Sequence, residues 1–135
     1  MQHIKWEDRF SVGIREFDLH HRTMVDMVND VININAGSDD PNALPAVVNN
    51  LVQYTLFHFT AEEALLVEFK FPELEAHKAE HQELMDQVQL YHDRIKTGES
   101  LDASELLEFL SHWLLDHILG MDMEYGPYLN RRGID

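Results

Sequence analysis

The sequence contains no cysteine among its 135 residues. Disulfide bridges, thiolate zinc sites and cysteine-ligated iron–sulfur clusters are therefore excluded. Basic residues are also scarce, because 10 Lys and Arg stand against 25 Asp and Glu and give a formal net charge of −15. A field of that sign repels phosphate backbones and anionic lipid surfaces, so we expect neither nucleic acid nor a membrane as a partner.

A long apolar run is missing as well. No segment reaches the roughly 18 apolar residues that a membrane helix requires, and the N-terminal MQHIKWEDRF lacks the apolar centre of a signal peptide. With the absence of cysteine, this predicts a soluble cytoplasmic protein. Apolar residues still make up 44% of the chain, enough for one sizeable core, so we expect residues 1–135 to form a single domain and a monomer.

Glycine and proline residues divide the chain into helical segments. Residues 1–16 read as an irregular arm, and the expected helices cover residues 17–36, 42–69, 72–96 and 103–119. Gly120 is expected to loosen the last helix, and Gly126 and Pro127 to prevent the tail from continuing it. Long helices joined by short loops predict an all-α fold, an antiparallel up-down-up-down four-helix bundle.

The nine histidines are the unusual feature of the composition. Each helix of a bundle turns inward an apolar stripe whose residues are three and four apart. Five histidines and two carboxylates fall on these stripes, namely His21, His58, Glu62, His77, His81, His117 and Asp122. A buried carboxylate without a partner is costly, so this set indicates bound cations.

Asp122 departs from the regular pattern, because it follows His117 by five residues. Five residues lie too far round an ideal α-helix to share one face. We therefore infer that the fourth helix bends or ends near Gly120, which turns Asp122 back towards the interior.

Seven nitrogen and oxygen donors exceed the four that a tetrahedral zinc ion needs. They suit two metal ions bridged by the carboxylates, and imidazole with carboxylate fits iron among the first-row metals. A ferritin-like site would need two Glu-x-x-His pairs, which the sequence lacks. A zinc-loaded structural bundle is the alternative metal assignment.

The stretch HKAEH at residues 77–81 also fits the H-x-x-E-H signature of a zinc protease, with Glu80 as general base. Glu80 lies about 100° round the helix from His81, off the inward face. We therefore expect Glu80 to be a surface residue, and we expect its replacement by alanine to leave the metal content and the spectrum unchanged.

Four stretches, taken in order, resemble the hemerythrin family and in particular its bacterial branch: FDLHH at 17–21, HFTAE at 58–62, HKAEH at 77–81 and HWLLDHILGMD at 112–122. The resemblance implies a non-haem di-iron centre with an oxo or hydroxo bridge. By position, His77, His81 and His117 would hold one iron, and His21 and His58 the other. Glu62 and Asp122 would bridge both.

The same resemblance implies that dioxygen binds at the open position of the two-histidine iron. The family's apolar oxygen pocket corresponds here to Phe59, Trp113, Leu114 and Ile118. The implied function is reversible dioxygen binding for storage, delivery or sensing, without catalysis. The alternative is a di-iron redox enzyme that acts on dioxygen, peroxide or nitrogen oxides.

Two histidines depart from the family pattern. His20 stands where related bacterial proteins usually carry Gln, and it competes with His21 as a ligand, although the stripe favours His21. His112 is an additional histidine for which a surface or interhelical position is expected. His3 and His92 are also expected at the surface.

Overall fold

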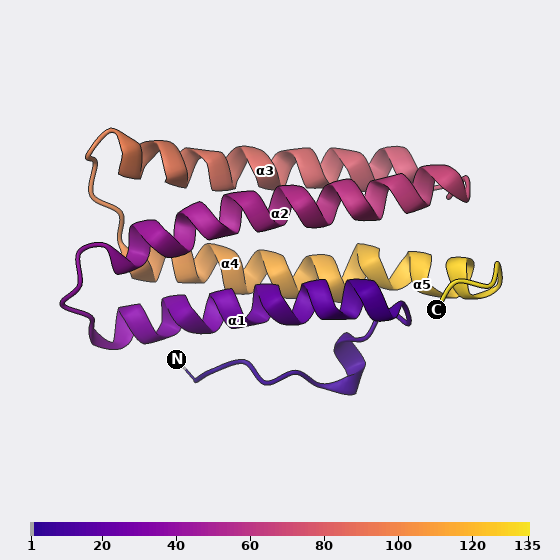
Figure 1. Ribbon diagram of the computed structural model, residues 1–135, viewed down its shortest axis with the longest axis horizontal. Helices are drawn as coiled ribbons and strands as arrows, with labels where there is room; N and C mark the ends of the chain where they lie inside the picture. The colour runs from indigo at the N-terminus through magenta and orange to yellow at the C-terminus, as the bar shows by residue number, and fades with distance from the viewer. Residues whose placement is uncertain (1) are drawn as a thin grey trace.

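The computed structural model describes residues 2–135, and it consists of long helices that run side by side in alternating directions (Figure 1). The four bundle helices are α1 (Arg15–Gly37), α2 (Ala43–Glu68), α3 (Leu74–Lys96) and α4 (Ala103–His117). No strand occurs in this described range. The predicted all-α four-helix bundle is confirmed, and the ends of the first three helices lie close to their predicted positions.

Local chemistry explains where the helices end. The Asp102 side chain accepts a hydrogen bond of 2.9 Å from the Ser104 N–H and so caps the start of α4. Gly98 adopts a φ of 81°, which allows Glu99 N–H to donate to the Arg94 carbonyl at 2.9 Å behind α3. Only glycine adopts this left-handed conformation without strain.

The C-terminal part of the chain differs from the prediction. After His117 the helix widens into one π-helical turn, η2 (Ile118–Asp122), and then continues as α5 (Met123–Asn130). The prediction that Gly126 and Pro127 stop the tail from extending the helix was wrong, because both lie inside α5. Gly126 is needed there, since a Cβ at this position would lie 1.9 Å from the Val12 carbonyl oxygen.

The N-terminal arm contains one short 3-10 helix, η1 (Asp8–Phe10), and is otherwise irregular, as predicted. It is nevertheless held firmly along α1 (Figure 1). Asp18 accepts hydrogen bonds from the Ser11 hydroxyl at 2.6 Å and from the Val12 N–H at 2.8 Å. Asn29 bonds both backbone polar groups of Ile4.

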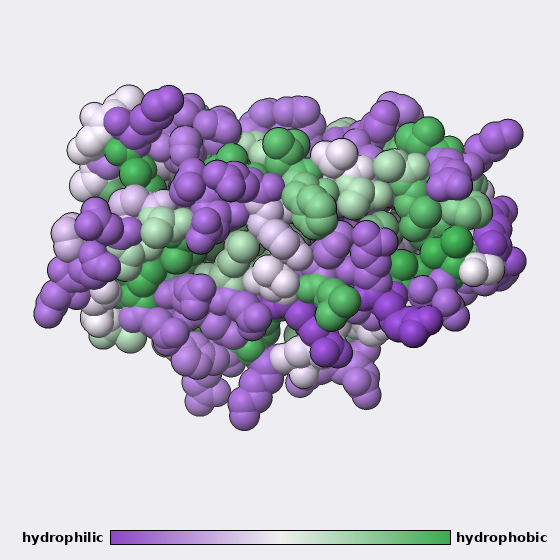
Figure 2. Space-filling view, in the orientation of Figure 1, coloured by the Kyte–Doolittle hydropathy of each residue, from purple (hydrophilic) through white to green (hydrophobic). Residues whose placement is uncertain are grey.

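The interior has two apolar clusters, one at each side of the polar site. The larger cluster includes Met24, Leu84 and Leu110, and the smaller one includes Phe17 and Leu66. On α1, His21 lies between Phe17 of the smaller cluster and Met24 of the larger one, and on α2 Glu62 lies between Phe59 of the larger cluster and Leu66 of the smaller one. Hydrophilic residues cover most of the face seen in Figure 2. No helix within residues 2–135 is long and apolar enough to cross a membrane.

Candidate metal centre

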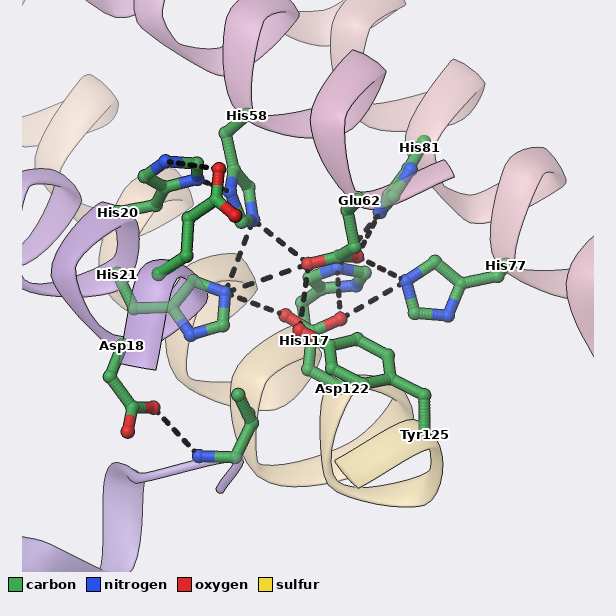
Figure 3. A network of polar contacts seen from close by, with 12 residues as sticks. Asp18, His20, His21, His58, Glu62, His77, His81, His117, Asp122 and Tyr125 are labelled. Atoms are coloured by element: carbon green, nitrogen blue, oxygen red, sulfur yellow. Dashed lines mark hydrogen bonds and ion pairs between the residues drawn. The ribbon is translucent and has the colours of Figure 1, made fainter. Parts of the chain in front are cut away.

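All seven inward donors predicted from the sequence meet at one place in the bundle (Figure 3). Their potential ligand atoms form two groups, within each of which all atoms lie within 4.8 Å of one another. The first group contains three histidines, His77, His81 and His117. The second group contains two, His21 and His58. Glu62 and Asp122 belong to both groups.

The two oxygens of each shared carboxylate face different groups. Glu62 Oε1 lies 2.5 Å from His77 Nε2, whereas Glu62 Oε2 lies 3.0 Å from His58 Nε2. Asp122 Oδ1 lies 2.9 Å from His117 Nε2, whereas Asp122 Oδ2 lies 3.0 Å from His21 Nε2. Each carboxylate is thus placed to join two neighbouring positions for metal ions.

The π-helical turn explains how Asp122 reaches this site. One π turn takes about one residue more than an α turn, since its hydrogen bonds join residues five apart. His117 and Asp122, five residues apart, therefore project into the same interior, and both are almost completely buried. The predicted bend near Gly120 is this π turn, and the helix does not end there.

A second layer of carboxylates holds two of the histidines. Glu63 Oε2 lies 2.8 Å from His81 Nδ1, and Glu80 Oε1 lies 2.6 Å from His117 Nδ1. When a carboxylate accepts the Nδ1–H of an imidazole, the Nε2 lone pair is free to bind a metal. Glu80 lies outside both ligand groups, as expected, but it is not a free surface residue, and its side chain is only 33% exposed.

His20 is a neighbour of the site rather than one of its predicted ligands. Its Nδ1 lies 2.8 Å from His58 Nδ1, and its Nε2 lies 3.9 Å from a Glu16 carboxylate oxygen. With the proton of His20 on Nε2, the His58 Nδ1–H donates to His20 and leaves His58 Nε2 free for a metal. His112, in contrast, is exposed and lies 3.2 Å from Asp116.

Charge couples the histidines and carboxylates of the metal-free site. Burial alone lowers the pKa of a histidine, but the Asp122 and Glu62 carboxylates outweigh it and raise the pKa of both His21 and His77 to about 9. The same balance, with Asp122 as the main partner, raises the pKa of His117 to about 10.

The pKa values of Glu62, Asp122 and His58 are lowered. Burial opposes ionisation of Glu62 and Asp122, yet the surrounding histidines hold the pKa of both carboxyls below its usual value. Burial lowers the pKa of His58 and that of His20. Both imidazoles are therefore expected to be neutral, in agreement with a single hydrogen bond between their Nδ1 atoms.

The donor set fits a pair of metal ions. Asp122 is fully buried, and no hydrogen bond of good geometry from the described residues reaches either of its oxygens. A buried carboxylate is costly unless a cation compensates its charge. In the metal-free chain the protonated His21, His77 and His117 do so, and a bound metal ion would take over that role. The Tyr125 hydroxyl donates a hydrogen bond of 2.9 Å to Glu62 and fixes the second carboxylate from outside the cluster.

Apolar side chains close the site on the three-histidine side. The Phe59 ring stacks on His81 with 3.7 Å between ring centroids, and the Trp113 ring lies nearly parallel to His117 at 5.8 Å. Leu114 and Ile118, the other predicted pocket residues, are each only 1% exposed. Four buried side chains are therefore available to exclude water from the metal positions.

Four residues of the second layer were not predicted from the sequence as partners of the site, namely Glu16, Glu63, Glu80 and Tyr125. Glu63 and Glu80 each neighbour a ligand residue in sequence, but so do many surface carboxylates of this acidic chain. Tyr125 lies in the helix that was not predicted. Glu80 follows His77 by three residues, a spacing that suggests a contact with His77. Its partner in the structure is His117 of α4, so the spacing did not reveal this contact.

Comparison with known proteins agrees with this geometry. The model of the hemerythrin HHE cation binding domain matches residues 12–129. A bacteriohemerythrin of Stenotrophomonas maltophilia is 34% identical over 90% of this chain and 78% of its own length. A bacteriohemerythrin of Clostridium acetobutylicum is 28% identical over 89% of this chain and 96% of its own length.

A solved structure extends the likeness to three dimensions. The crystal structure of a wild-type hemerythrin superposes with a TM-score of 0.86 at 27% identity, covering 92% of this chain and 95% of the other. The match of the domain model spans most of the sequence and includes every residue of the two ligand groups. The chain therefore belongs to the hemerythrin HHE cation-binding domain family.

Proposed function

We propose that this protein binds dioxygen reversibly at a di-iron centre held by the seven inward side chains. His77, His81 and His117 would hold one iron, and His21 and His58 the other. Glu62 and Asp122 would bridge the pair. The observation that carries the proposal is the division of each carboxylate between the two histidine groups, with its two oxygens facing different groups.

The unequal numbers of donors support a single open position. Three histidines and two carboxylate oxygens give one metal five protein donors, whereas two histidines and two oxygens give the other only four. A solvent-derived bridge between the metals would add one donor to each. The two-histidine position would then have one donor fewer and would take a small ligand, and a ferrous pair would supply the electrons that dioxygen binding requires.

The chain's own residues prepare this site in three ways. Glu63 and Glu80 hold His81 and His117 with Nε2 pointing inward, which pre-organises two of the ligands. Tyr125 fixes one oxygen of Glu62. Phe59 and Trp113 exclude water and protons, and this exclusion favours release of unchanged dioxygen over its reduction.

One titration tests the proposal. The protein is reconstituted anaerobically with ferrous iron, the iron per chain is counted, and the visible spectrum is followed through admission of oxygen and an argon purge. We expect two irons per chain and a charge-transfer band that appears with oxygen and disappears on purging. His77→Ala should lower the iron content, whereas His112→Ala, which changes an exposed histidine, is the matched control.

The alternative outcomes discriminate between functions. Two irons with prompt, irreversible oxidation would favour a redox enzyme or a sensor over a carrier. Stable binding of zinc with no uptake of iron would favour a structural metal site. A hydrolytic activity lost in Glu80→Ala would restore the zinc-protease interpretation, which the contact of Glu80 with His117 Nδ1 argues against.

A further inference from the structure

An open groove of about 1140 Å³ separates α3 from α4. Close backbone contacts join α1 with α2, α2 with α3 and α1 with α4. The backbones of α3 and α4 approach less closely, and long side chains meet between them, as in the ring contact of Tyr91 with Phe109 and the ion pair of Arg94 with Glu105. The bundle is therefore least tightly packed along this one face.

The groove has the length and shape of a site for a helix. Its α3 wall runs from Ala76 to Tyr91, which corresponds to about 22 Å at roughly 1.5 Å per residue. Along this wall the lining residues are spaced three and four apart, and the same spacing occurs from Glu105 to Asp116 on α4. Two parallel helical faces of this kind accept a third helix between their ridges.

Apolar side chains line the bottom of the groove and acidic side chains line its edges. Leu84, Phe109 and Trp113 form the apolar part. Glu83 and Glu108 stand on opposite walls, both are exposed, and neither forms an ion pair among the described residues. No Lys or Arg lines the described groove. The surface thus complements a ligand with an apolar stripe and flanking positive charges.

We propose that the α3–α4 groove binds an amphipathic, basic helix of a partner protein. Its apolar residues would contact Leu84 and Phe109, and its Lys or Arg residues would pair with Glu83 and Glu108. A second copy of this chain is a poor occupant, because its net charge of −15 would oppose the same acidic groove. The same sign of charge disfavours nucleic acids and anionic membranes as occupants.

The location gives such a partner access to the metal centre. Glu80 lines the groove and also holds His117 Nδ1 at 2.6 Å. A helix in the groove would thus lie one side chain away from a predicted metal ligand. The groove requires no metal to form, so its proposal stands or fails independently of dioxygen binding.

A synthetic helix tests the groove. The probe is a peptide of about 15 Leu and Lys residues with apolar positions three and four apart, long enough to span the groove. Its control is a peptide of the same composition in an order that breaks the helical pattern. Binding to the full chain is measured by isothermal titration calorimetry, and we expect saturable binding of the amphipathic peptide alone.

Two charge-reversal variants locate the site. Glu83→Lys with Glu108→Lys changes the groove, and Asp26→Lys with Asp30→Lys makes the same change of charge on exposed residues of α1. We expect the groove variant to weaken binding at least about tenfold and the α1 variant to weaken it less than about twofold, because close charge pairs outweigh the general field.

Three results would overturn the proposal. One is equal binding of both peptides, which would indicate only a general attraction of cations. Another is equal loss of affinity in both charge-reversal variants. A third is a dimer, detected by analytical ultracentrifugation, that the groove variant abolishes, because the occupant would then be a second copy. Circular dichroism of each variant verifies that the exposed substitutions leave the fold intact.

Discussion

At the scale of single residues, the second layer around the histidines determines which ring nitrogen faces the metal positions. Carboxylates hold His81 and His117, whereas the neutral imidazole of His20 holds His58. A carboxylate partner makes a histidine a stronger donor than a neutral partner does. The three-histidine group therefore combines more ligands with more basic ones, and this asymmetry favours a small ligand at the other group.

The role of His20 is tested by two substitutions of different chemistry. His20→Leu removes the acceptor for His58 Nδ1, so we expect a loss of metal affinity of roughly 10-fold, at the lower end of the effects typical of second-layer partners. His20→Gln retains an acceptor oxygen and should restore most of the affinity. Competition with a chelator measures both variants, and equal affinity of His20→Leu and wild type would contradict the assignment.

The role of Glu80 is the reverse of the expectation from sequence. Because it accepts from His117 Nδ1, Glu80→Ala should lower metal affinity and shift the visible spectrum of the loaded protein. Glu83→Ala, one turn away and without an ion pair among the described residues, is the matched control. Unchanged affinity and spectrum in Glu80→Ala would support the original view of Glu80 as a surface residue.

At the scale of elements, α5 is fixed by its contact with the N-terminal arm. A side chain at Gly126 would overlap the Val12 carbonyl, so Gly126→Ala must displace the arm or α5. We expect a destabilisation of about 3 kcal/mol, typical of overpacking. Gly120→Ala is the control, because a Cβ added there would meet no atom within 4 Å, and it should change stability by less than about 1 kcal/mol. Urea unfolding measures both, and similar losses would refute the contact.

At the scale of the whole molecule, the metal-free protein holds protons that a metal must displace. With pKa values raised to about 9, 9 and 10, His21, His77 and His117 are protonated at pH 7. Loading at pH 7 should therefore release about three protons per chain from these histidines, and a hydroxo bridge formed from water would add about one more, measured in a pH-stat under anaerobic conditions. The histidine part of the release should disappear as the pH rises past the pKa of His117, and a release independent of pH would contradict the charge state.

The same groups set the pH dependence of folding without metal. A histidine whose pKa is raised in the folded state makes its full contribution to stability below the pKa that it has in the unfolded chain, near 6.5. This contribution is lost as the pH rises through the folded pKa values of about 9 and about 10. Glu62 and Asp122, whose pKa values are lowered, stabilise the fold above their ordinary values, and this contribution is lost in acid. His20 and His58, whose pKa values are lowered, reduce the stability of the fold as the pH falls below about 6.5. The melting temperature of the metal-free chain should therefore be highest near about pH 6.5 and should fall on both sides of it.

The helices and the inward donors could be predicted from the sequence without any tertiary information. Apolar periodicity and the glycines at 37 and 98 specify local backbone conformation, which depends on neighbouring residues alone. The same periodicity placed six of the donors on inward faces, namely His21, His58, Glu62, His77, His81 and His117. The resemblance added the assignment to two irons, and that assignment, the single domain and the monomer stay predictions.

Only the tertiary structure determines how these donors pair and which residues support them. The π turn at Ile118–Asp122 leads into α5, which contacts Val12 more than a hundred residues earlier and shares the smaller apolar cluster with Leu66. The contacts of Glu63, Glu80 and His20 with ring nitrogens join different helices, and their helical positions alone resemble those of exposed residues. Sequence periodicity specifies which face a residue occupies, whereas packing between helices determines which atom it meets.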